Sequence, residues 1–311
     1  MRRPSAVLIV VCSGWGTIGL VVRTVDLPAA AITCGRVWVG ALGLGVVILA
    51  RGRPSPAGSG GHKQSPAGSG GHEPSPGPRL FSYQPGRVVF TGAILAAHWL
   101  AFITALQHAP IGTVVLIVFL GPIGVALGAP RVLGERSSPR TLAALALAVG
   151  GFLLVAAPGV RSAGVLGPAL ALLAAVLFVA LVLVSKPLAA VYGGPRLAFL
   201  ELAVAGVVLL PAGLTAGWGA PRLDWLWLLV LGLVHTALGV SLYLAALARV
   251  PAVHAGILGY LEPAGAVGCG WLFLHEQPGP ATIAGAVLIV AAGLLVVRAG
   301  ATRPEVIGVP G

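Results

Sequence analysis

Long apolar runs separated by short polar segments dominate the pattern of this sequence. A membrane-spanning helix needs about 20 mostly apolar residues. Ten segments meet this requirement, at residues 5–22, 28–50, 88–107, 111–130, 140–157, 165–185, 196–216, 224–247, 253–274 and 280–298. Many of them are rich in Gly and Ala, which lets helices approach closely in lipid. The pattern therefore predicts an all-α integral membrane protein with ten transmembrane helices.

The stretch at 51–86 interrupts this pattern. It contains a tandem decamer, SPAGSGGHKQ at 55–64 followed by SPAGSGGHEP at 65–74. Pro, Gly and Ser at this density cannot form a packed core, so we predict a disordered loop inserted between the second and third helices. His62 and His72 could bind a stray metal ion, but a repeat-expanded linker is the interpretation that we favour for them.

Basic residues between the spans predict the orientation, because cytoplasmic loops carry an excess of Lys and Arg. With a cytoplasmic N-terminus, three basic residues fall outside, namely Arg23, Arg161 and Arg222. Fifteen then fall inside: Arg2, Arg3, Arg51, Arg53, Lys63, Arg79, Arg87, Arg131, Arg136, Arg140, Lys186, Arg196, Arg249, Arg298 and Arg303. No small-residue cleavage site follows the basic start, so we expect an uncleaved first helix and two cytoplasmic termini.

Composition excludes several classes of protein. The chain has 57% hydrophobic and 9% charged residues, whereas soluble domains carry roughly 25% charged residues. The net charge of +11 could suggest nucleic acid, but the basic residues lie between apolar runs, so we expect none. The three cysteines lie inside apolar runs without metal-ligand spacing. We therefore predict no metal site and no cofactor, with the lipid bilayer of an inner or plasma membrane as the main partner.

An internal repeat relates the two parts of the chain. Residues 105–155 align without a gap to 246–296 at an offset of 141, which pairs Pro110 with Pro251, Pro122 with Pro263 and Glu135 with Glu276. We predict repeats at 1–158 and 159–300, followed by a cytoplasmic tail at 301–311. Five spans are an odd number, so the second repeat is inverted relative to the first. Inverted repeats are a signature of alternating-access carriers, although some channels share them.

A family resemblance rests on motifs in both halves. Tyr260-Leu261-Glu262-Pro263, Gly270 to Glu276 and the run 285–295 resemble the second EamA repeat of the drug/metabolite transporter superfamily. His275 departs from it, since Gly is usual before Glu276. Trp15-Gly16 and Arg36 also stand where the family favours them. Phe119-Leu120-Gly121-Pro122 resembles the threonine/homoserine exporter branch. The resemblance covers nearly the whole chain except 51–86, and it implies a ten-helix carrier that moves small metabolites, usually outward.

Ionisable groups inside spans are costly, so each is a functional candidate. Arg36 could attract a substrate carboxylate, or it could snorkel or pair with carbonyls or Glu262. His98 and His235 lie midway along counterpart helices and could carry a proton, or they could be packing residues. Glu262 could bind a substrate amine or a proton, or it could brace the interface between the repeats.

Prolines and aromatic residues within the spans complete the candidate set. Pro122 and Pro263 remove a backbone donor and predict a kinked or broken helix near the membrane midplane. Trp15, Phe119 and Tyr260 could wall a cavity, or they could face lipid. Glu201 is expected at an interface or beside Arg196, and Glu135 and Glu276 are expected to cap helices or form salt bridges.

Three function classes follow. The first is a secondary carrier that exports small metabolites, amino acids or related compounds foremost, with protons as one possible coupling ion. The second is a facilitator or channel for small solutes. The third is a membrane enzyme, but the chain has no clustered Asp, His or Cys and no nucleotide-binding motif, so we predict no enzymatic activity. A homodimer is one of the oligomeric states that the sequence allows.

Overall fold

The computed structural model describes residues 2–18, 21–22, 25–52, 83–157, 164–219, 222–275 and 277–299. These residues form helices and turns, with no strand among them, so the all-α prediction is confirmed for this part of the chain. Several predicted features lie outside the described residues: most of the loop at 51–86 with its decamers, Glu276, and the tail at 301–311.

The helices follow one another with short connections. The first half contains α1 (Arg2–Trp15), α3 (Ala29–Gly52), α4 (Pro85–His108), α5 (Ile111–Val118), α6 (Gly121–Val132) and α7 (Pro139–Ala156). The second half contains α8 (Leu166–Tyr192), α9 (Gly194–Thr215), α10 (Arg222–Val230), the π-helical η2 (Leu231–Leu238), α11 (Gly239–Leu247), α12 (Ala252–Gly259), α13 (Leu261–Leu274) and α14 (Pro280–Ala299).

Eight helical segments among the described residues are long and apolar enough to cross a membrane, with α5–α6 and α10–α11 each counted as one. The remaining two predicted spans take shorter forms. The span expected at 5–22 is helical in α1 only as far as Trp15, and a turn follows at Gly16 and Thr17. The span expected at 253–274 is divided into α12 and α13 at Tyr260. The count of ten therefore stays a prediction.

The outer surface of the helical assembly is apolar and its interior holds polar groups. Val46, Leu214 and Val287 are 67%, 75% and 62% exposed, whereas His98 and Glu201 are buried. A soluble protein rarely shows a large contiguous apolar surface to water. Apolar side chains outside and ionisable ones inside are the arrangement that a hydrocarbon solvent favours.

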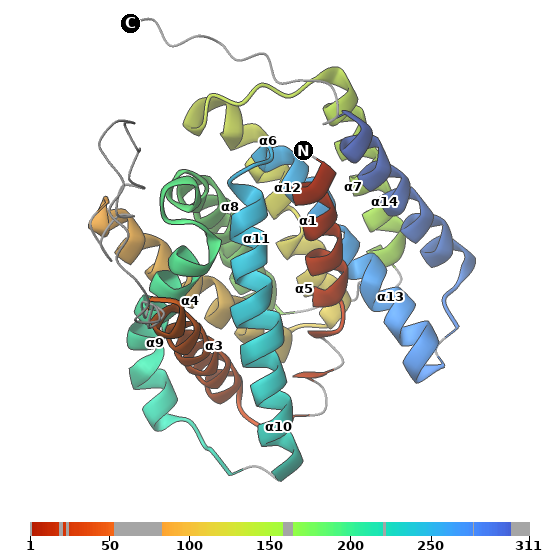
Figure 1. Ribbon diagram of the computed structural model, residues 1–311. Helices are drawn as coiled ribbons and strands as arrows, with labels where there is room; N and C mark the ends of the chain where they lie inside the picture. The colour runs from red at the N-terminus through yellow and green to blue at the C-terminus, as the bar shows by residue number, and fades with distance from the viewer. Residues whose placement is uncertain are drawn as a thin grey trace, which may run out of the picture.

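Helices from the two halves interleave (Figure 1). α1 packs against α11 and α13, α3 against α9 and η2, α4 against α8 and α9, and α7 against α14. Two facing glycines let α7 and α14 approach closely: a Cβ on Gly151 would lie 2.6 Å from the Gly285 carbonyl oxygen, and one on Gly285 would meet the Gly151 carbonyl in turn. Small residues at such positions let backbones pack directly in lipid.

Two spans are interrupted at matching positions. α5 ends at Val118 and α6 begins at Gly121, while α12 ends at Gly259 and α13 begins at Leu261. Pro122 and Pro263 lie in the first turn of the helix that follows each break. The first backbone N–H groups of a helix have no intrahelical partner, so proline is tolerated there. The interruptions bring non-helical backbone into the interior of the assembly.

Candidate functional site

A cavity of about 180 Å³ lies where helices of the two halves meet. Its walls are mostly apolar and aromatic, and they include Trp15, Trp99, Phe102, Phe119 and Phe178. The ionisable and hydroxyl side chains that reach it are Cys12, Arg36, His98, Ser185, Glu201, His235, Tyr243 and Glu262. An apolar hollow with a few convergent polar groups is the usual form of a small-molecule site.

Arg36 reaches the cavity from α3 and is 6% exposed. Its Nε donates to the Thr236 hydroxyl at 3.0 Å, and its guanidinium carbon lies 4.3 Å from the centre of the Trp99 ring. A guanidinium over an indole face is a favourable cation–π contact. Among the described residues no ion pair joins Arg36 to Glu262, although the two opposite charges attract one another. Arg36 is therefore held in place without a bonded carboxylate.

His235 lies in η2, one of the π-helical turns that are frequent at functional sites. Its Nε2 is 2.8 Å from the Thr17 hydroxyl, and its own carbonyl accepts the Trp15 indole N–H at 3.0 Å. The Trp15 ring packs against Tyr243 with centroids 5.4 Å apart. These contacts fix the end of α1 against η2 on one side of the cavity.

His98 approaches the cavity from α4. Its Nδ1 is 2.8 Å from the Ala174 carbonyl oxygen, so Nδ1 carries the proton that this oxygen accepts. The imidazole lies between Phe102 and Phe178, whose ring centroids are 6.5 and 5.8 Å away. His98 is thus a buried histidine with one satisfied nitrogen, and it faces the same space as His235.

Glu262 stands in the first turn of α13, directly after the break at Tyr260. Carboxylates are stabilised at helix N-termini by the helix dipole. The carboxylate side chain is half-buried and borders the cavity. The turn that follows α1 packs tightly against the first turn of α13, since a Cβ on Gly16 would lie 2.6 Å from the Glu262 carbonyl oxygen. The site thus combines a broken helix, a carboxylate and a close helix contact.

Tyr260 and Pro263 are the two candidates that do not line the cavity. Tyr260 is fully buried, and its hydroxyl donates to the Phe119 carbonyl at 2.8 Å. Its ring packs with Phe119 and Phe152 at centroid distances of 5.8 and 5.4 Å. Tyr260 therefore faces neither lipid nor the cavity and ties one break to the other. Trp15, Arg36, His98, Phe119, Pro122, His235 and Glu262 all border the cavity.

Glu201 corrects an expectation from the sequence. It is 1% exposed and lines the cavity, whereas Arg196 is exposed on the same helix. The Ser185 hydroxyl donates to its Oε1 at 2.6 Å, and Thr91 is a second hydroxyl neighbour. Residues five apart on a helix point in different directions, so the pairing with Arg196 does not form. An ionisable residue within an apolar run was the signal that sequence reasoning undervalued.

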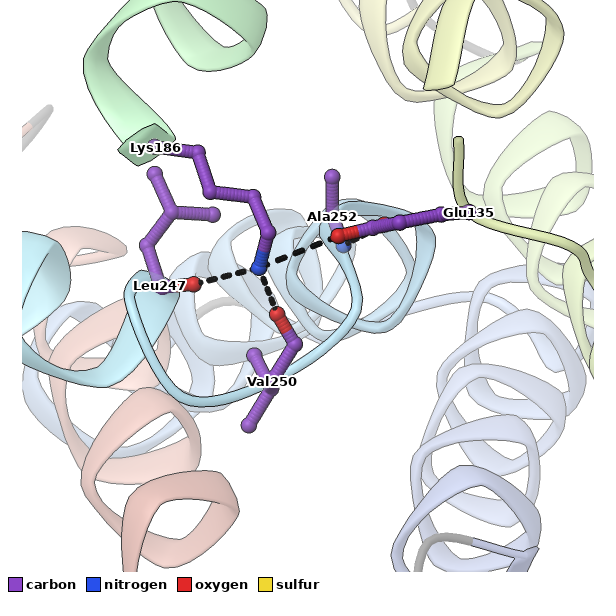
Figure 2. A network of polar contacts seen from close by, with 5 residues as sticks. All are labelled: Glu135, Lys186, Leu247, Val250 and Ala252. Carbon is purple, nitrogen blue, oxygen red and sulfur yellow. Dashed lines mark hydrogen bonds and ion pairs between the residues drawn. The ribbon is translucent and has the colours of Figure 1, made fainter. Parts of the chain in front are cut away.

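A polar network lies at the end of the cavity where α8 finishes and α12 begins (Figure 2). Lys186 Nζ is 3.2 Å from Glu135 Oε1, donates to the Leu247 carbonyl at 2.8 Å and donates to the Val250 carbonyl. Glu135 Oε2 accepts the Ala252 N–H at 2.7 Å, so Glu135 caps α12 as the sequence suggested. We call these five residues the Lys186 network. Leu247 also lines the cavity, so the network closes directly on it.

The Lys186 network joins the two halves of the chain. Glu135 belongs to the loop after α6, and the other four residues of the network all belong to the second half. A second contact between halves lies nearby, where the Thr141 hydroxyl of α7 is 3.3 Å from His254 Nε2 of α12. These contacts hold the two halves together at this end of the cavity.

Comparison with known proteins fits this architecture. A model of the EamA-like transporter family matches residues 4–157 and 165–298. A solved structure titled "Crystal structure of protein" shares the fold at a TM-score of 0.76 and 21% identity, covering 95% of this chain and 99% of its own. No curated protein sequence matches the chain at a significant level. The resemblance to EamA is confirmed, and the exporter branch stays a prediction. The family match over both halves, together with the apolar helices, means that this multi-pass membrane protein belongs to the EamA-like transporter family.

Proposed function

We propose that this chain is a secondary carrier that exports small metabolites, amino acids or related compounds foremost, across an inner or plasma membrane. One observation carries the substrate class: Arg36 and Glu262 present opposite charges to one small cavity without a direct ion pair in the described part of the chain. An amino acid offers a carboxylate to Arg36 and an ammonium group to Glu262. Aromatic walls suit an apolar side chain.

The proposed mechanism is alternating access between two inverted repeats at 1–158 and 159–300. The cavity lies where their helices interleave, as expected for carriers of this type. With both termini cytoplasmic, the end of α8 and the start of α12 lie on the cytoplasmic side. The Lys186 network then closes the cavity toward the cytoplasm, and loading of substrate requires it to open.

Purified protein in liposomes tests the proposal. The vesicles are preloaded with one unlabelled amino acid at a time, and uptake of the labelled compound by counterflow is measured. We expect uptake with the intact chain and with Arg131→Gln, which alters an exposed arginine of α6, and loss of uptake with Arg36→Gln. Equal uptake by Arg36→Gln and the intact chain would contradict the assigned site. Single-channel currents recorded from the protein in a planar bilayer would show that it is a channel and would refute the carrier proposal.

A further inference from the structure

Glu201 is a buried carboxyl that the assignment of Arg36 and Glu262 leaves without a role. It lies in the second turn of α9 and borders the cavity. The residues around it on α9, Leu197, Leu200, Leu202 and Ala205, are fully buried and apolar. A carboxylate in such surroundings is stable only with a cation or several donors, since ionised groups are costly away from water.

The partners of Glu201 in the described part of the chain are hydroxyl groups. Ser185 donates at 2.6 Å, and Thr91 is the second neighbour. Lys186 follows Ser185 in the chain, but its ammonium group is directed away to Glu135 and two carbonyls (Figure 2). Arg36 is held by Thr236 and Trp99. Glu201 therefore has no ion-pair partner among the described residues.

Other ionisable groups face the same cavity from the helices around α9. They are Arg36 on α3, His98 on α4, His235 on η2 and Tyr243 on α11, with Glu262 contributed by α13. In the described part of the chain none of them forms a hydrogen bond or ion pair with Glu201, and His98 and His235 already bond to Ala174, Thr17 and Val230. Glu201 is thus chemically separate from the charges assigned to substrate, although it shares their cavity.

We propose that Glu201 is a proton-binding site that couples transport to a proton gradient. The inference rests on the proposed carrier function and adds its energy source. While the part of the cavity next to Glu201 is closed to water, the carboxyl group holds a proton and is neutral. When the cavity opens toward the cytoplasm, water reaches the carboxylate and the proton leaves. The proton moves inward as the metabolite moves outward, so the exchange of one proton for a neutral substrate carries one positive charge into the cell.

The position of Ser185 next to Lys186 supports a link between opening of the Lys186 network and protonation of Glu201. Ser185 donates a hydrogen bond to Glu201, and the next residue, Lys186, pairs with Glu135, which in turn caps the start of α12. Both side chains leave the same turn of α8, so a movement of α8 that opens the Lys186 network also changes the surroundings of Glu201. Opening of the Lys186 network and exposure of Glu201 to water are thereby linked through the same movement of α8.

The first test needs no transport. Infrared difference spectra of the reconstituted intact chain should contain a protonated carboxylic acid band at neutral pH that shifts in heavy water. We expect the band to disappear in Glu201→Gln and to remain in the matched control Glu262→Gln. Absence of the band from the intact chain, or its loss only in Glu262→Gln, would overturn the proposal without affecting the carrier function.

The second test separates coupling from substrate binding. Glu201→Gln mimics the protonated acid, so we expect counterflow within about twofold of the intact chain but no accumulation driven by a proton gradient. Gradient-driven accumulation at the intact level, or loss of counterflow by a folded Glu201→Gln protein, would overturn the proposal. If Glu201→Gln fails to fold, Ser185→Ala serves instead, with a shifted pH profile expected for gradient-driven transport and an unchanged one for counterflow. Failure of the intact chain in counterflow would instead refute the proposed function.

Discussion

The break between α5 and α6 and the break between α12 and α13 occupy matching positions in the two halves. At the offset of 141, Phe119 corresponds to Tyr260, Gly121 to Glu262 and Pro122 to Pro263. The segment 119–123 carries no polar side chain, whereas its counterpart carries a phenol and a carboxyl group. Tyr260 even satisfies a carbonyl of the other break, at Phe119.

The two breaks therefore share the same backbone interruption, but only the second one carries polar and ionisable side chains. A broken helix needs a short turn followed by the first turn of a new helix, where the backbone N–H groups have no intrahelical partner and a proline is tolerated. Both copies provide this arrangement. Charge is costly in lipid, so a second carboxyl group without a ligand would destabilise the protein. One copy therefore bears the charge and the other supplies apolar wall, as Phe119 and Pro122 do.

The largest expected effect comes from removing the charge that distinguishes the second break from the first. Glu262→Gln keeps the shape of the side chain and removes the charge proposed to bind a substrate ammonium group. We expect substrate binding to weaken by at least about 30-fold, since loss of one partner of a buried charge pair costs 2 kcal/mol or more. Binding can be followed by titration of the purified protein, with Arg131→Gln as the control. Unchanged affinity would remove Glu262 from the site.

The starts of the two broken spans both follow a proline that offers no side-chain cap of its own. Glu135 caps α12 through the Ala252 N–H, and its counterpart Glu276 lies outside the described residues. We expect Lys186→Met to lower the free energy of unfolding by about 2 kcal/mol, because it leaves the Glu135 carboxylate without its cation. Thermal unfolding in detergent measures the change. A Lys186→Met, Glu135→Gln double variant should recover part of the loss, and an equal loss in both would contradict an ion-pair role.

Tyr260→Phe tests the direct link between the two breaks. It makes the second break resemble the first at this position and leaves the Phe119 carbonyl without its donor. A buried polar group left without a partner costs about 1–3 kcal/mol, so the melting temperature should fall. Tyr83→Phe alters an exposed tyrosine and is the matched control. Equal melting temperatures for the two variants would show that this hydrogen bond adds nothing to stability.

The smallest expected effect concerns the prolines that the breaks share. Pro122→Ala and Pro263→Ala should each change stability by less than about 1 kcal/mol, because a proline in a first helical turn acts mainly through the entropy of the unfolded chain. Thermal unfolding of both variants tests whether the backbone plan is equivalent in the two halves. A large loss from one variant alone would show that the breaks differ in backbone as well as in side chains.

The sequence determined the features that depend on local chemistry. Hydropathy located the helices, the repeated prolines located the two breaks, and the rule that charge is rare in lipid selected Arg36, His98, His235 and Glu262, all of which border the cavity. Each of these inferences needs only residues that are neighbours along the chain.

Only the tertiary structure decided which faces of the helices meet. Glu201 turned inward to Ser185 and away from Arg196, Tyr260 reached the other half, and Lys186 paired with Glu135 across the chain. α1 also ended sooner than its apolar run suggested. Such outcomes depend on the rotation of one helix against another, which is set by side-chain packing between segments far apart in the sequence. A hydropathy pattern that is apolar on all sides, as in these spans, carries little information about that rotation.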